Sequence, residues 1–175
     1  RKIGNADKAL GADVQGRAPR SVVTSYDLGL VNTESRFEVP KIVEALRRKG
    51  FGTLCFYGPP GTGKTALAEH IAQELQRPLM IRQASDLVSK FVGETEQNMA
   101  KMYEEAETEQ AVLLLDEADS FLRSRRLAER SYEVSEVNEM LQGMERYAGI
   151  FICTTNLFQD LDEAALRRFT FKIQF

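Results

Sequence analysis

The sequence predicts an α/β fold in which a parallel sheet lies between two layers of helices. Runs of strand-forming residues alternate with segments whose apolar residues recur at helical spacing, as parallel sheets require. Two of these runs, VLLL and IFIC, are almost continuously apolar, which indicates strands covered on both faces. With 175 residues, 43% of them hydrophobic, the chain is long enough for one core and short for two full domains.

The N-terminal part of the chain divides into a leader and a first helix. Residues 1–20 contain Gly, Ala and charged residues without an apolar period, so we expect a flexible leader or linker ahead of a domain formed by residues 21–175. A first helix is expected over residues 35–49, because four apolar residues recur there at intervals of three and four. These residues are Val39, Ile42, Val43 and Leu46.

Five strands and three further helices follow in alternation. The strands are expected at residues 53–57, 78–83, 111–115, 149–154 and 169–175. Between the first four strands, three stripes of apolar residues have the spacing of helices that cover a sheet. The stripes are Leu67, Ala68, Ile71, Ala72 and Leu75; Met99, Met102, Tyr103 and Ala106; and Val134, Val137, Leu141 and Met144.

Residues 58–65, GPPGTGKT, match the phosphate-binding loop pattern. The loop directly follows the strand LCFY and opens the helix that begins near Lys64, which is the context that the pattern needs. Its glycines let backbone N–H groups close around phosphate oxygens, and the helix N-terminus adds a partial positive charge. We therefore expect nucleotide binding at Gly58, Pro59, Pro60, Gly61, Thr62, Gly63, Lys64, Thr65 and Ala66. Within this set, Lys64 is expected on the β- and γ-phosphates and the Thr65 hydroxyl on magnesium. The alternative is a Gly-rich turn without a ligand.

Asp116 and Glu117 end the third apolar run, AVLLLDE. The C-terminal end of a buried parallel strand borders the crevice where α/β sheets bind ligands. We predict that Asp116 binds magnesium and the nucleotide, and that Glu117 orients and polarises the attacking water. The alternative is a solvated strand end. Residues 116–119 also spell DEAD, as in one RNA helicase family, but such helicases need two RecA-like domains and this chain has one phosphate-binding loop.

Charge and hydropathy argue against two classes of partner. The net charge of −3 gives no basic footprint, so nucleic acid is not an expected partner. No run approaches the roughly 20 apolar residues that cross a bilayer, and the first residues lack the hydrophobic region of a signal peptide. Cys55 and Cys153 lie in apolar runs and are expected to be buried and structural. We expect a cytoplasmic location.

Three more segments resemble the AAA ATPase family in their order and spacing. They are residues 89–94 (SKFVGE), 153–156 (CTTN) and 161–169 (LDEAALRRF). The last is similar to the compact second region of homology of spastin- and katanin-like members, and the resemblance covers roughly residues 26–175. It implies a P-loop NTPase fold, a three-layer αβα domain with a five-stranded parallel sheet of order 5-1-4-3-2. It also implies ATP and Mg²⁺ as cofactors, with Walker A and Walker B motifs at the sites already described. The family's helical lid does not follow residue 175, so the resemblance implies a fragment that is mostly monomeric and slow.

The resemblance also assigns roles to four residues. Asn156 matches the sensor-1 residue that contacts the γ-phosphate or its water, and the alternative is a cap on the next turn. Arg167 and Arg168 match arginine fingers that act on the neighbouring subunit's γ-phosphate, and the alternative is two solvated arginines at a helix end. Phe91 matches the pore-loop aromatic that grips a threaded polypeptide, and the alternative is a core aromatic.

The function implied by the resemblance is ATP hydrolysis by a hexameric ring that remodels or unfolds a protein partner. The rival from another class is an ATP-switched nucleic-acid loader or regulator, which would use the basic cluster Arg123, Arg125, Arg126 and Arg130. The cluster could also line a pore or an intersubunit face, but a solvated helix or loop face is the commoner explanation. A third hypothesis, a degenerate scaffold, conflicts with the intact Lys64, Asp116, Glu117 and Asn156. The segment 26–29 matches an adenine-contacting position only loosely.

Overall fold

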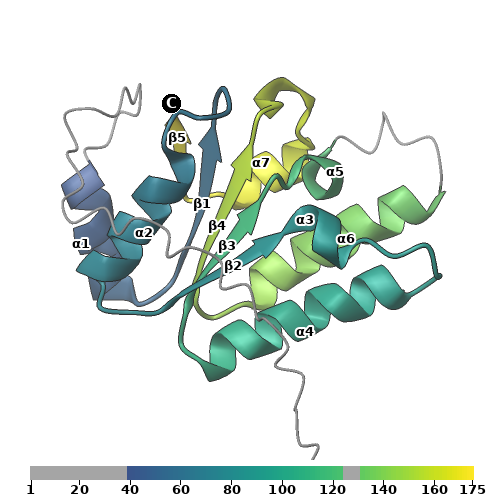
Figure 1. The fold of residues 1–175 in the computed structure, drawn as a ribbon, viewed down its shortest axis with the longest axis horizontal. Helices are drawn as coiled ribbons and strands as arrows, with labels where there is room; N and C mark the ends of the chain where they lie inside the picture. The colour runs from purple at the N-terminus through teal and green to yellow at the C-terminus, as the bar shows by residue number, and fades with distance from the viewer. Residues whose placement is uncertain (1–38, 124–130) are drawn as a thin grey trace, which may run out of the picture.

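The computed structural model describes residues 39–123 and 131–175, which form a parallel sheet between two layers of helices (Figure 1). The expected leader, the 26–29 segment and the arginines 125, 126 and 130 lie outside the described residues. No helix within the two described ranges is long and apolar enough to cross a lipid bilayer.

The element order confirms the predicted alternation of strands and helices. The strands are β1 (Gly52–Tyr57), β2 (Leu79–Gln83), β3 (Val112–Asp116), β4 (Ile150–Thr155) and β5 (Phe171–Gln174). The helices are α1 (Val39–Lys49), α2 (Lys64–Glu74), α3 (Ala84–Leu87), α4 (Glu94–Thr108), α5 (Asp119–Leu122), α6 (Ser131–Arg146) and α7 (Glu163–Arg168), with a 3₁₀ turn, η3 (Phe158–Asp160). The sheet order is β2-β3-β4-β1-β5 and all pairings are parallel, as the resemblance implied.

Two details differ from the sequence-based expectation. Strands β1 and β2 end at Tyr57 and Gln83 as predicted, and the other strand boundaries move by one or two residues. The largest shift is at the start of the last strand, which begins at Phe171 because Phe169 instead ends α7 as its buried C-cap. The short helices α3 and α5 and the turn η3 were not expected. Each has three or four residues, which is too few for an apolar period to appear in the sequence.

Alternate residues of each strand face opposite helical layers, which gives the molecule two cores. On one face, Leu54 and Phe56 of β1 pack with α1 and α2. On the other face, Cys55 of β1 and Cys153 of β4 pack with α4 and α6, so both cysteines are buried as expected. Burial on both faces accounts for the near-continuous apolar strands.

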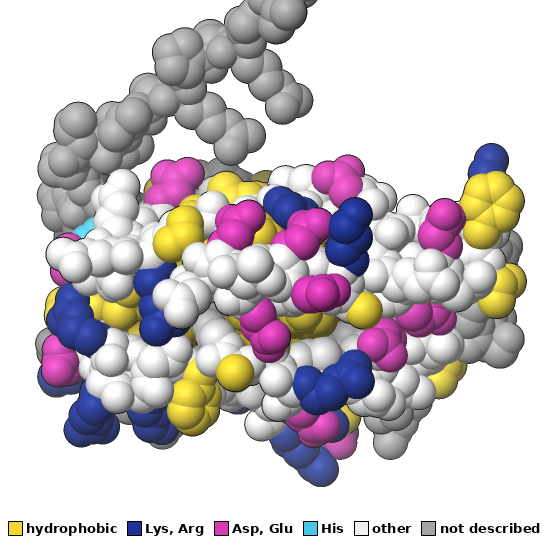
Figure 2. All heavy atoms as spheres, turned by 90° about the horizontal axis from the view of Figure 1, so that it is seen from below, with side chains coloured by type: hydrophobic (Ala, Val, Ile, Leu, Met, Phe, Trp, Pro, Cys, Tyr) yellow, Lys and Arg dark blue, Asp and Glu magenta, His cyan; other side chains and the backbone are white. Residues whose placement is uncertain are grey.

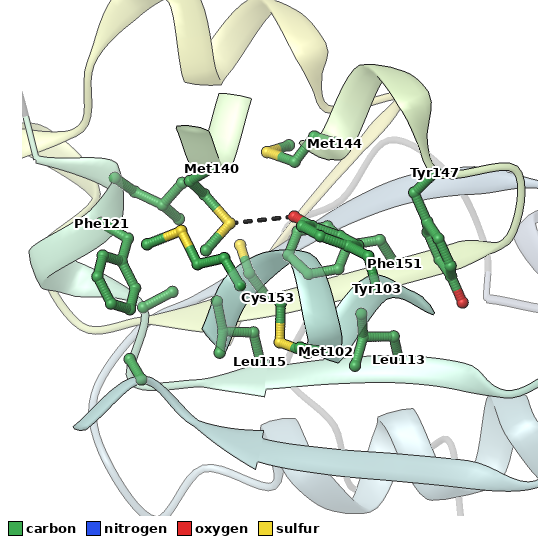
Figure 3. Close-up of a cluster of buried hydrophobic side chains, with 14 of the residues drawn as sticks. Met102, Tyr103, Leu113, Leu115, Phe121, Met140, Met144, Tyr147, Phe151 and Cys153 are labelled. Atoms are coloured by element: carbon green, nitrogen blue, oxygen red, sulfur yellow. Dashed lines mark hydrogen bonds between the residues drawn. The ribbon is translucent and has the colours of Figure 1, made fainter. Parts of the chain in front are cut away.

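Methionines and aromatic rings fill the core beneath α4 and α6 (Figure 3). Tyr103 of α4 donates a hydrogen bond to Met140 Sδ at 3.1 Å, and its ring lies 5.8 Å from that of Phe151. Met140 is fully buried, whereas Val134 is only half-buried, so the predicted stripe of α6 was wrong at that position. The flexible methionine reaches the tyrosine, which the helical period alone did not indicate.

The buried hydroxyl of Tyr147 should make the stability of the fold depend on pH in the alkaline range. Its hydroxyl donates to the Ala111 carbonyl at 3.0 Å, and burial, helped by Glu107, raises the pKa of Tyr147 to about 12. Burial also raises the pKa of Tyr103. An unfolded tyrosine titrates near pH 10, so above that pH the unfolded chain binds fewer protons than the folded chain. The free energy of unfolding should therefore fall between about pH 10 and 12.

We expect Tyr147→Phe to reduce this alkaline loss of stability by about 2 kcal/mol, because about two pKa units of difference between the two states disappear. At pH 7 the same variant should be less stable by about 1 kcal/mol, since the Ala111 carbonyl loses its donor. Urea unfolding of both proteins from pH 8 to 12 measures the two effects. Equal pH slopes for the two proteins would contradict the prediction.

Candidate nucleotide-binding and catalytic site

The predicted phosphate-binding loop lies at the C-terminal edge of the sheet, between β1 and α2 (Figure 1). Gly58, Gly61 and Gly63 all have positive φ, at 142°, 77° and 97°. A Cβ atom on Gly58 would lie 2.5 Å from the Phe175 carbonyl oxygen, and one on Gly61 would meet nothing within 4 Å. The loop therefore needs glycine for its backbone conformation, and at Gly58 also for space.

The start of α2 presents backbone N–H groups to this loop. The first bond of the helix runs from the Leu67 N–H to the Gly63 carbonyl at 3.0 Å, so the N–H groups of residues 64–66 precede it. No side chain caps the helix, and the Thr62 hydroxyl bonds instead to the Pro59 carbonyl at 2.8 Å. Uncapped N–H groups and the helix dipole together favour a bound anion.

Lys64 connects the loop to the end of β4. Its ammonium donates to the Gly58 carbonyl at 2.7 Å, to the Pro59 carbonyl at 2.8 Å and to Asn156 Oδ1 at 3.0 Å. Burial lowers the pKa of Lys64, whereas the nearby Asp116 and Asp119 raise it. A phosphate beside this ammonium would favour its charged form further. The structure thus brings Asn156 to the loop, as the sensor-1 assignment requires.

Asp116 and Glu117 leave the end of β3 in different environments. Asp116 is half-buried and its carboxylate accepts hydrogen bonds from both neighbouring strands: from the Thr154 hydroxyl on Oδ1, and from Gln83 Nε2 on Oδ2 at 3.2 Å. Glu117 is exposed, with a φ of 55° in the left-handed region. The first carboxylate is held in place at the sheet edge and the second faces the open cleft.

These groups line one cleft of about 190 Å³. Its wall consists of Pro60, Gly61, Thr62, Gly63, Lys64, Thr65, Ala66, Asp116, Glu117, Thr154 and Asn156. The volume is smaller than the roughly 300–1,000 Å³ of sites that enclose a whole small molecule, so the cleft suits the phosphate end of a nucleotide. The Thr65 hydroxyl and the Asp116 carboxylate are hard oxygen donors on one wall, which fits Mg²⁺ completed by phosphate oxygens and water.

The capping alternative for Asn156 is wrong, because its neighbour takes that role. The Leu157 N–H donates to the Thr155 hydroxyl oxygen at 3.0 Å, and the Asn156 N–H donates to Asp119 Oδ1 at 3.2 Å. The Thr155 hydroxyl also bonds to the same Asp119 oxygen. The Asn156 side chain is thereby left to face Lys64.

The two arginines of α7 have different surroundings in the structure, although the sequence could not distinguish them. The Arg167 side chain is 82% exposed and has only a loose contact of 3.7 Å with Glu163, itself exposed. Arg168 is 28% exposed, bonds to Glu145 Oε1 at 2.6 Å and donates to the Ala164 carbonyl at 2.9 Å. Neither arginine is among the residues that line the cleft. Arg167 projects from the molecule, and Arg168 is held against α6.

Phe91 lies in the segment between α3 and α4, at the right-hand edge of Figure 1. Its side chain is 65% exposed, and the adjacent Val92 is fully exposed. The alternative of a core aromatic is therefore wrong. Lys90 Nζ lies 5.8 Å from the centre of the Phe91 ring, so a cation and an aromatic ring share the tip of the loop.

Hydrogen bonds from α4 hold the base of this loop. The Ser89 N–H donates to Thr95 Oγ1 and Asn98 Nδ2 donates to the Leu87 carbonyl, both at 3.0 Å. The Phe91 N–H donates to the Ser89 hydroxyl oxygen at 3.2 Å, and Gly93, with a φ of 82°, is the N-cap of α4. The loop is anchored, with its apolar tip in solvent.

Sequence reasoning missed three residues that contact the predicted site residues. Thr154 and Gln83 bond to Asp116, and Glu145 bonds to Arg168. Gln83 is the last residue of β2 and Thr154 the second-last of β4, the strands on either side of β3, so placing the polar ends of adjacent strands side by side would have suggested both. Nothing local indicates Glu145, which lies near the C-terminal end of α6 and is separated from α7 in the sequence by β4 and η3.

Comparison with known proteins agrees with this geometry. Residues 54–175 match the "ATPase family associated with various cellular activities (AAA)". The chain belongs to the AAA family of ATPases. Membership of this family implies nucleotide binding, and the spastin-like resemblance of LDEAALRRF finds support among the relatives.

Two kinds of relative are similar over most of the chain. An uncharacterized protein, ORF529 of Acidianus two-tailed virus, is 33% identical over 156 residues, or 78% of this chain. Spastin of Drosophila erecta and spastin of Drosophila melanogaster are each 34% identical over 142 residues, or 77% of this chain. The chain spans 29% of the length of the viral protein and 19% of the length of these spastins.

Proposed function

We propose that this AAA domain hydrolyses ATP with Mg²⁺ in a ring of like subunits and uses the energy to remodel or unfold a protein partner. The observation that carries the proposal is the convergence of Lys64, the adjacent Asp116 and Glu117, and Asn156 on one cleft from three separate places in the sequence. These are the groups that bind a triphosphate, hold its metal and activate a water.

Each residue has a separate task in the proposed reaction. The loop N–H groups and Lys64 bind the phosphates, while the Thr65 hydroxyl and Asp116 hold Mg²⁺. A bound metal ion would offset the negative charge that develops on the phosphate oxygens. Glu117 accepts a proton from the water that attacks the γ-phosphorus in line, and Asn156 orients that water. ADP and inorganic phosphate are the products.

In a ring, a neighbouring subunit would complete this site by supplying an arginine. No arginine is among the described residues that line the cleft, whereas Arg167 extends into solvent from the same subunit. A guanidinium supplied by a second copy would stabilise the transition-state charge on the γ-phosphate. Arg167 is free to reach outward, so we assign it as the finger and Arg168 as its support.

The proposed protein substrate contacts the loop around Phe91. An exposed aromatic ring next to a fully exposed valine, on a loop anchored at its base, offers an apolar grip without sequence preference. In Figure 2, Lys and Arg side chains gather at the left end of the face and lie beside acidic side chains over the rest of it. The net charge of −3 is not the balance that a nucleic-acid-binding domain usually has. The protein partner is therefore favoured over the nucleic-acid loader.

We expect Phe91→Ala in the full-length protein to abolish ATP-driven unfolding of a partner and the stimulation of ATP hydrolysis by that partner. Affinity for ATP should not change, because Phe91 lies outside the nucleotide cleft. Unfolding of a fluorescent protein that carries a disordered tail, measured beside phosphate release, reports both activities.

Phe51→Ala is the matched control. Phe51 is also exposed, by 56%, but it precedes β1 at the opposite edge of the sheet, so its loss should leave unfolding unaffected. If Phe91→Ala unfolds substrate as well as wild type does, the gripping role is wrong. Loss of DNA binding in Arg123→Glu would then favour the loader.

A further inference from the structure

One buried residue holds the turn that carries both catalytic acids. Thr154 lies in β4 and is 1% exposed. Because Leu115 and Cys153 are paired in the parallel register, Asp116 and Thr154 are the next neighbours across β3 and β4. The Thr154 side chain therefore lies beside the end of β3, where the chain leaves the sheet.

Thr154 contacts three successive residues of this turn. Its hydroxyl donates to Asp116 Oδ1, and the same oxygen accepts the Glu117 N–H at 2.9 Å. Its backbone carbonyl accepts the Ala118 N–H at 2.9 Å. A hydroxyl has one proton to donate and lone pairs to accept, so it can make both side-chain bonds at once. Gln83 holds the other Asp116 oxygen from β2.

These bonds stabilise a backbone conformation that glutamate disfavours. Glu117 has a φ of 55°, and a non-glycine residue stays in that region only where its surroundings hold it there. The conformation directs Glu117 into the cleft while the preceding Asp116 stays against the sheet. Threonine is branched at Cβ, which limits its rotamers and favours a fixed hydroxyl position.

We propose that Thr154 is a positioning residue for ATP hydrolysis, whose single hydroxyl orients Asp116 and fixes the backbone of Glu117. It does not touch the reacting atoms and acts through the two acids. The inference rests on the proposed roles of these acids. If Thr154 has this role, the spacing between the Asp116 and Glu117 carboxylates depends on one hydroxyl of the neighbouring strand β4.

The first test compares Thr154→Val with Thr154→Ser in the full-length protein. Valine keeps the shape of threonine and lacks the hydroxyl, so kcat should fall by about 10- to 100-fold, the usual effect of removing a supporting hydrogen bond at a catalytic site. Serine keeps the hydroxyl and should restore most of the rate. The dissociation constant for ATP, measured by calorimetry, should stay near the wild-type value in both variants because the phosphate-binding loop is unchanged.

Hydrogen exchange provides a readout that needs no turnover. In Thr154→Val the Glu117 N–H loses its acceptor and should exchange faster, whereas the Ala118 N–H keeps its bond to the backbone carbonyl and should not. In Thr154→Ser both N–H groups keep their acceptors and should remain protected from exchange. Equal protection of Glu117 in wild type and Thr154→Val would overturn the inference.

A double variant separates positioning from general destabilisation. If Thr154 acts through Glu117, Thr154→Val should slow the residual rate of a Glu117→Gln protein much less than it slows wild type. Tyr147→Phe, which removes a buried hydroxyl at the opposite edge of the sheet, controls for lost stability and should keep its kcat. Thr154→Ala removes the same hydroxyl if the valine variant does not fold.

The outcomes distinguish this inference from the proposed function. A folded Thr154→Val protein with wild-type kcat, beside an inactive Glu117→Gln protein, overturns the role of Thr154 and leaves the ATPase assignment intact. Normal hydrolysis by Glu117→Gln instead removes the catalytic role on which the inference rests. A rate lost in Thr154→Val and recovered in Thr154→Ser supports the inference.

Discussion

Glu117→Gln should reduce ATP turnover by roughly 10²- to 10⁴-fold, the usual contribution of a positioned general base, while ATP still binds. The amide has nearly the same size as the carboxylate but cannot accept the proton of the attacking water. The phosphate-binding loop, Lys64 and Asp116 remain in place, so the variant should hold ATP with little loss of affinity. Phosphate release and calorimetry with ATP measure the two properties separately.

Glu109→Gln is a suitable control for this substitution. Glu109 follows α4 at the opposite edge of the sheet and is exposed, so the same chemical change there should leave turnover unchanged. Normal hydrolysis by Glu117→Gln would show that another group activates the water. The slow variant also serves as a trap, because a ring that retains ATP should retain its protein partner for identification by mass spectrometry.

Arg167→Ala should have the largest effect of all, a loss of about 10³- to 10⁵-fold in kcat of the assembled protein, which is the range for arginine fingers. Arg167 projects into solvent and its contact with Glu163 is exposed, so the fold should tolerate the change. Arg168→Ala should cost less in kcat and more in stability, since Arg168 connects α7 to Glu145 of α6. Phosphate release and thermal unfolding of both variants test the assignment.

Mixing two inactive variants tests whether the finger acts between subunits. Subunits with Glu117→Gln have an intact Arg167, and subunits with Arg167→Ala have an intact Glu117. At interfaces where the first kind supplies the finger and the second kind the water-activating acid, hydrolysis should return. If mixing restores no activity, the finger does not act across an interface, and a greater kcat loss in Arg168→Ala than in Arg167→Ala would reverse the assignment.

The fold was predictable because its signals are local and repeated. The stripe of α2 has the period of a helix. The runs of β3 and β4 are apolar without alternation, from which burial on both faces follows. The same holds for the phosphate-binding loop, since backbone conformation and ligand contact involve the same few consecutive residues. Asp116 and Glu117 were placed correctly because a strand end locates them.

The remaining features depend on which distant segments meet. Met140 rather than Val134 is buried because Tyr103 of another helix lies opposite it. Thr155 rather than Asn156 caps the turn after β4 because Lys64 takes the Asn156 side chain. In both cases two residues of the same segment are equally suited, by sequence alone, to be buried or to cap the turn. A side chain from a distant segment decides which of the two does so.

Consecutive residues were enough to establish the P-loop α/β class, the phosphate-binding loop and the pair of acids. Their physical basis is the geometry of a short stretch of backbone, which its own residue types specify. The different exposure and contacts of Arg167 and Arg168, the exposure of Phe91 and the contact of Thr154 with both acids required the folded molecule. Each of these depends on hydrogen bonds or burial between segments far apart in the chain, and only packing brings such segments within a few ångströms of one another.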